Sequence, residues 1–85
     1  MAGQFQVFPN PTPDGKVFLL GTDLQSQTIE LSLWNLNGAQ LYREQLSVVS
    51  GRTETSLDLA SLPSGIYFLQ CRDLAGKTMR WKIIR

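Results

Sequence analysis

The sequence predicts an all-β fold in which seven short strands form two stacked sheets. Three segments alternate apolar and polar residues with a period of two, which is typical of strands buried on one face. Clusters of Gly, Pro, Asn, Asp and Ser separate the apolar segments, and strand centres recur about every 11 to 14 residues, close to the spacing of antiparallel sandwiches and barrels. No window shows a convincing helical period.

The alternation is clearest in residues 28–33, 53–59 and 78–83. Successive side chains of a strand point to opposite faces, so each of these segments has one apolar and one polar face. The side chains expected to face the core are Ile29, Leu31, Leu33, Thr55, Leu57, Leu59, Met79, Trp81 and Ile83. The residues that alternate with them are expected to lie on the outer faces of the sheets.

Four further segments are rich in Val, Ile, Phe, Tyr or Leu and end at turn residues: Gln4–Phe8, 16–20, 39–46 and 65–72. We expect at most one short helical turn, at residues 59–62. Seven short strands cannot bury their apolar faces in a single sheet, so two sheets must stack. The fold class predicted is therefore a seven-stranded immunoglobulin-like antiparallel β-sandwich.

The length of 85 residues allows one compact domain. We interpret residues 1–3, which lack the basic and apolar regions of a signal peptide, as a linker remnant, and residues 4–85 as the domain. The longest apolar runs have four residues, whereas a membrane-spanning helix needs about 20.

The residue types argue against catalysis. The chain has no histidine and one cysteine, so it lacks the usual general base near neutral pH and the ligands of a common zinc site. Cys71 lies in an apolar run and is expected to be a buried, inert thiol. The carboxylates are scattered along turns and polar strand faces. We therefore expect no enzyme activity, no cofactor and no metal.

The small net charge of +1 hides an uneven distribution: residues 72–85 carry +4 and residues 1–71 carry −3. One interpretation is that Arg80 and Lys82 are only the solvated face of the last strand. The other is that this basic strand is a docking edge, open to strand addition by a partner. Nucleic-acid binding is not expected, because the chain has no basic patch away from this end.

Four motifs in order resemble one known family. They are Phe8-Pro9-Asn10-Pro11, the Asn37-Gly38 turn, residues 57–69 (LDLASLPSGIYFL), and Gly76-Lys77 leading into an apolar-basic strand. Together they resemble the C-terminal sorting domain of proteins exported by the type IX secretion system. Phe8 stands where tyrosine is usual, and an asparagine stands where aspartate is frequent before the glycine.

The resemblance implies that the domain is a sorting signal on a cargo protein of a Gram-negative bacterium. The cargo would pass through the periplasm, and an outer-membrane translocon and a shuttle protein would recognise the domain. A sortase-like cysteine protease would then remove it by cleavage before or near Phe5, leaving the cargo secreted or anchored at the outer membrane and cell surface.

The residues of these motifs also have structural explanations of their own. Gly38, Leu59, Leu62, Gly65 and Tyr67 are expected to be structural: Gly38 in a hairpin turn, Leu62 as a plug, and the Tyr67 hydroxyl bonded to nearby backbone. For the Pro-Asn-Pro segment, a stiffening role and partner contact both stay open. The residues expected to contact a partner are Pro9, Asn10, Pro11, Lys77, Arg80, Lys82, Ile83, Ile84 and Arg85.

The alternative function is a small fibronectin-like adhesion or carbohydrate-binding β-sandwich module. Such a module would need an exposed aromatic platform, for which Phe18, Trp34 and Phe68 are the candidates. Weak self-association through edge strands is a further expectation.

Overall fold

The structure, a computed structural model, describes residues 3–9, 12 and 14–85. It confirms the seven-stranded antiparallel sandwich, and the described residues form no helix. The single turn at residues 59–62 is closed by a 2.9 Å hydrogen bond from the Leu62 amide to the Leu59 carbonyl. The strands are β1 (Gln4–Phe8), β2 (Lys16–Thr22), β3 (Thr28–Asn35), β4 (Gln40–Ser47), β5 (Thr53–Asp58), β6 (Ile66–Asp73) and β7 (Thr78–Ile84).

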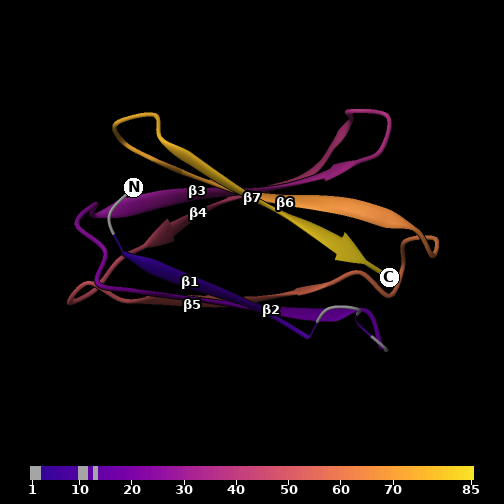
Figure 1. Cartoon of the computed structure of the whole chain (residues 1–85), viewed down its shortest axis with the longest axis horizontal. Helices are drawn as coiled ribbons and strands as arrows, with labels where there is room; N and C mark the ends of the chain where they lie inside the picture. Colours follow the sequence, from indigo (N-terminus) through magenta and orange to yellow (C-terminus); the bar gives the residue numbers. More distant parts are fainter. Residues whose placement is uncertain (1–2, 10–11, 13) are drawn as a thin grey trace.

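The strands are divided between a three-stranded sheet, ordered β1-β2-β5, and a four-stranded sheet, ordered β4-β3-β6-β7. Figure 1 shows them as two layers, with β1, β2 and β5 in the lower one. All the strand pairs are antiparallel. The four-stranded sheet consists of two hairpins, β3–β4 and β6–β7, joined by the pairing of β3 with β6.

The core lies between the two sheets and follows the predicted alternation. Ile29, Leu31 and Leu33 are 1%, 0% and 4% exposed, as expected from their shared face of β3. They pack with apolar side chains from both sheets, including Val17, Leu19, Leu57, Leu59, Tyr67, Leu69, Cys71 and Ile83. Burying such side chains supplies most of the free energy that holds the two layers together.

Two side chains have an exposure that the alternation alone does not predict. Ser32 lies on the outer face of β3 but is only 3% exposed, because the Trp34 side chain reaches back to it and donates a 2.9 Å hydrogen bond from Nε1 to Oγ. Met79 was expected to face the core but is 37% exposed. Because β7 is the edge strand of its sheet, Met79 is flanked by a neighbouring strand on one side only.

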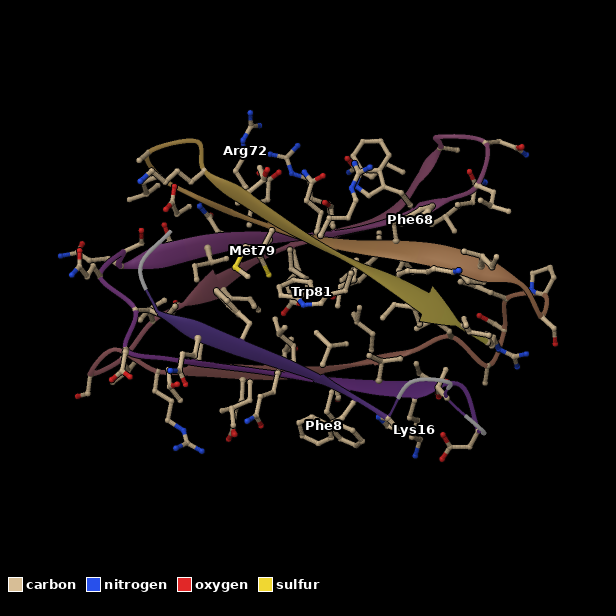
Figure 2. All side chains as sticks on the ribbon, in the orientation of Figure 1. Phe8, Lys16, Phe68, Arg72, Met79 and Trp81 are labelled. Atoms are coloured by element: carbon tan, nitrogen blue, oxygen red, sulfur yellow. The ribbon has the colours of Figure 1, made fainter. Side chains whose placement is uncertain are left out.

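The edge strands β1 and β7 lie near each other on one flank of the sandwich (Figure 2). The rings of Phe5 and Trp81 meet there with a centroid distance of 5.6 Å, and Trp81 points between the layers in Figure 2. The Thr12 amide also donates a 3.0 Å hydrogen bond to the Ile84 carbonyl. The last strand therefore contacts β1 and the segment between β1 and β2, in addition to pairing with β6.

Candidate partner-recognition surface

The segment between β5 and β6 forms a corner that fixes the end of the sandwich. Leu59 is 1% exposed, and Leu62 packs partly buried against the core. Tyr67, at the start of β6, is 5% exposed and donates its hydroxyl to the Pro63 carbonyl at 2.5 Å. This is the arrangement of a tyrosine corner in immunoglobulin-like sandwiches. The corner residues thus support the fold and present no reactive group to solvent.

The β3–β4 and β6–β7 hairpins have turns of the same construction. The Asn35 Oδ1 accepts hydrogen bonds from the amides of Asn37 and Ala39, both at 2.9 Å. The Asp73 Oδ1 accepts the equivalent bonds from Ala75 and Lys77, at 3.0 and 2.9 Å.

Each turn then places a glycine at a positive φ angle, 81° for Gly38 and 85° for Gly76. A side chain would be strained in that region, whereas glycine is not. Lys77, the exposed basic residue expected to contact a partner, follows the second of these turns.

The residues after Lys82 are held to the body of the domain. Ile83 is 1% exposed and belongs to the core, whereas Ile84 is 41% exposed. The backbone of Arg85 pairs with Gly65 through two hydrogen bonds of 3.0 and 2.9 Å. The Arg85 guanidinium donates to the carbonyls of Leu59 and Ala60 at 2.7 and 3.0 Å, and to the Ser64 hydroxyl at 3.3 Å. The side chains of Ile83 and Arg85 are therefore used within the fold.

The Pro-Asn-Pro segment, also expected to contact a partner, is described only at its first residue. Pro9 is exposed, whereas Asn10 and Pro11 lie outside the described residues.

The outer face of the four-stranded sheet carries two aromatic side chains in register. Trp34 of β3 is paired directly with Phe68 of β6. The hydrogen bond from Trp34 to Ser32 ties the indole to its own strand. The Arg80 guanidinium lies 5.7 Å from the Phe68 ring centroid and donates a 2.9 Å hydrogen bond to the Gln70 Oε1. These contacts hold an aromatic pair and a guanidinium on one surface.

Four of the eight basic residues of the chain lie on this same face. Arg80 and Lys82 come from β7, opposite Gln70 and Phe68, and Arg72 comes from β6; Figure 2 shows Arg72 pointing away from the other sheet. Arg43 comes from β4, opposite Ser32, and forms a 3.0 Å ion pair with Glu30. We call this surface the cationic face; it consists of Trp34, Arg43, Phe68, Arg72, Arg80 and Lys82.

The sequence predicted the basic residues of the last strand, and it gave Trp34 and Phe68 as candidates for an exposed aromatic platform only under the alternative function. It missed Arg43 and the placement of all these residues on one face. Arg43 lies in the part of the chain with net negative charge. Its place on the face depends on the order β4-β3-β6-β7. A local signal existed, because Trp34 and Phe68 each lie out of phase with the core residues of their strands.

The outer face of the three-stranded sheet has a different character. Phe8 and Phe18 stack there with a centroid distance of 5.8 Å, and Figure 2 shows Phe8 and Lys16 on the side away from the other sheet. A shallow hollow of about 380 Å³ lies beside them, partly lined by Glu54 and Ser56. Glu54 and Asp58 pair with Leu20 and Lys16 on this face. Lys16 lies opposite Asp58, and Arg52 forms a 3.6 Å ion pair with Glu54, so this face lacks the excess of basic groups that the cationic face has.

Burial explains the inert character expected of Cys71. The side chain is 0% exposed, and burial raises the pKa of its thiol to about 12. The reactive thiolate is therefore disfavoured. Among the described residues, no group of three or more His, Cys, Asp and Glu side chains is placed to hold a metal ion. The described part of the chain also contains no helix with the length and apolar character to span a membrane.

Comparison with known proteins gives one result. Residues 6–85 match the model of a family described as the secretion system C-terminal sorting domain. No curated protein and no solved structure matches the chain.

Proposed function

The chain belongs to the family of type IX secretion C-terminal sorting domains, and on that premise we propose that it is recognised by the outer-membrane translocon and shuttle protein of that system and then removed. Membership of the family means that the domain is a sorting signal for export to the cell surface or for secretion from a bacterium. The observation that carries the proposal is the family match, which spans the sandwich from β1 to β7.

The positions of the family motifs support a signal that is read as a folded object. The residues from Leu59 to Tyr67 build the corner, and Gly38 and Gly76 build the two hairpin turns. A cargo protein of any sequence could carry such a domain, because the fold depends on contacts within the domain itself. The surface side chains are then available for recognition, whereas the motifs maintain the shape that presents them.

The proposed removal by a sortase-like cysteine protease fits the start of the sandwich. The strand β1 begins at Gln4 and pairs with β2 from Gln4 opposite Thr22 to Phe8 opposite Phe18. A protease needs an extended segment that is free of such pairing. The scissile bond is therefore expected before β1. Cleavage there would leave all seven strands in the removed domain and none on the cargo. After transit through the periplasm, the cargo would be secreted or anchored at the outer membrane.

The test is a fusion of the whole 85-residue chain to the C-terminus of a periplasmic reporter, in a bacterium that has a type IX system. We expect the reporter at the cell surface or in the medium, and in the periplasm when the translocon is deleted. Retention of the reporter in the periplasm of the intact host would contradict the proposal. Deleting residues 82–85 is a poor test, because it removes Ile83 from the core and the Arg85 contacts with the corner.

A further inference from the structure

The cationic face has the composition of the centre of a protein–protein interface. Aromatic residues and arginine are enriched at such centres, where a few residues supply most of the binding free energy. Trp34 and Phe68 lie directly opposite each other on neighbouring strands, and both side chains are half-buried. Their rings therefore have little conformational freedom left to lose on binding. Arg80 is already held by Phe68 and Gln70. The centre of this face is therefore preorganised.

The charge of the face specifies its partner. Arg43, Arg72, Arg80 and Lys82 are exposed, and among the described residues of the same face Glu30 is the one carboxylate. Arg43 and Glu30 are paired with each other, with side chains 65% and 34% exposed. The four basic residues of the face therefore exceed its one carboxylate by three charges. An acidic surface would complement them, and long-range attraction would speed the encounter.

We propose that the cationic face is the surface through which this domain docks on its export machinery, and that the docking partner is an acidic protein surface. The inference rests on the sorting function proposed above and identifies the part of the domain that the machinery reads. It shifts recognition from the edge of the last strand to a face built by β3, β4, β6 and β7.

The centre of the face favours a protein partner. Small ligands bind in concave sites, whereas protein partners dock on flatter surfaces. A hollow of about 290 Å³ lies toward one end of the face and is partly lined by Glu30 and Arg72, but Trp34 and Phe68 line neither this hollow nor the other four described. An acidic polysaccharide shares the charge of the proposed partner, so the experiment must separate the two classes.

The experiment uses two double variants of the reporter fusion with identical changes in net charge. The face variant combines Arg43→Glu and Arg72→Glu, from β4 and β6. The control variant combines Lys16→Glu and Arg52→Glu, which lie off the face and are not among the residues expected to contact a partner. Each variant breaks one exposed ion pair, Arg43–Glu30 or Arg52–Glu54.

We expect the face variant to lower export by about tenfold or more, and the control variant to stay within about twofold of the wild type. Thermal unfolding of the purified chains establishes whether both variants fold. If the face variant does not fold, the corresponding glutamine variants replace both double variants, and we again expect export to be lower in the face variant than in the control. Equal loss of export in both variants, or loss in the control alone, would overturn the inference.

Two polyanions separate the partner classes in vitro. We expect the wild-type and control chains to elute from immobilised poly-L-glutamate at higher salt than the face variant, and polygalacturonate to retain the wild type less well. Stronger retention on polygalacturonate that is lost in Trp34→Ala would overturn the inference and favour the carbohydrate-binding alternative. Normal export of the face variant would overturn the docking surface alone, whereas absence of wild-type export would overturn the sorting function and this inference with it.

Discussion

Arg85 and Leu59 lie 26 positions apart in the sequence, and the Arg85 Nε donates a 2.7 Å hydrogen bond to the Leu59 carbonyl. The same guanidinium reaches the Ala60 carbonyl at 3.0 Å. It therefore satisfies two carbonyl groups of the turn that follows β5, next to the tyrosine corner. The basic residue nearest the end of the last strand has a structural function, whatever partner the domain binds.

The first prediction concerns this arginine. We expect Arg85→Ala to lower the free energy of unfolding by about 2 kcal/mol, because hydrogen bonds to charged groups contribute more than neutral ones. Arg85→Lys should restore less than half of the loss, because an ammonium group cannot reproduce the planar fork of donors. Urea denaturation measures both values. The control is Arg52→Ala, whose exposed ion pair with Glu54 at 3.6 Å should contribute less than about 1 kcal/mol. An unchanged stability in Arg85→Ala would show that the contact is dispensable.

The second prediction concerns the corner. Tyr67→Phe removes the hydroxyl that donates to the Pro63 carbonyl and leaves the buried ring in place. We expect a loss of about 1 kcal/mol in the free energy of unfolding, the usual contribution of one hydrogen bond. Tyr42→Phe is the matched control, because the Tyr42 hydroxyl bonds to the exposed Glu44 side chain and the residue is 39% exposed. Equal effects in the two variants would contradict the special role of the corner.

The strands could be predicted because their signals are local. The alternation of residues 28–33 gave the correct core side of β3, and the turn residues separated all seven strands. The boundaries shifted where a turn or a bulge intervenes: β5 ends at Asp58, whose Oδ1 accepts the Ala60 amide at 2.9 Å and begins the turn. The strand expected from the alternation of residues 28–33 continues through Trp34 to Asn35.

The candidate site could be predicted only in part, because it depends on which strands are neighbours. The excess of basic residues after Arg72 is visible in the sequence. Arg43 joins them only through the pairing of β4 with β3 and of β3 with β6. Likewise, periodicity placed Ser32 on the outer face but could not show that Trp34 covers it. Local patterns give the face of a residue, whereas the contacts across the sheet decide its exposure.

The third prediction compares the two equivalent hairpin turns. Asn35 and Asp73 each accept two backbone amides through Oδ1, so a neutral amide oxygen performs the same role as a carboxylate. We expect Asp73→Asn to change the free energy of unfolding by less than about 0.5 kcal/mol, and Asp73→Ala to lower it by about 1 kcal/mol or more. Thermal or urea unfolding measures both. A loss in Asp73→Asn as large as that in Asp73→Ala would show that the charge of Asp73 matters more than its geometry.

The last prediction concerns pH and Cys71. Burial raises the pKa of its thiol from 9.0 to about 12, so above pH 9 the unfolded chain loses this proton while the folded chain keeps it. Stability contributed by the protonated thiol is therefore complete below about pH 9 and decreases as the pH rises from about 9 toward 12. We expect the free energy of unfolding of the wild type to fall more steeply between pH 8.5 and pH 10.5 than that of Cys71→Ala, measured by urea denaturation under reducing conditions. The variant will be less stable at every pH because it creates a cavity, so the test is the difference in slope. Parallel slopes would mean that the thiol ionises equally easily in both states, and rapid labelling of the native chain by a thiol reagent at pH 8 would independently contradict its burial.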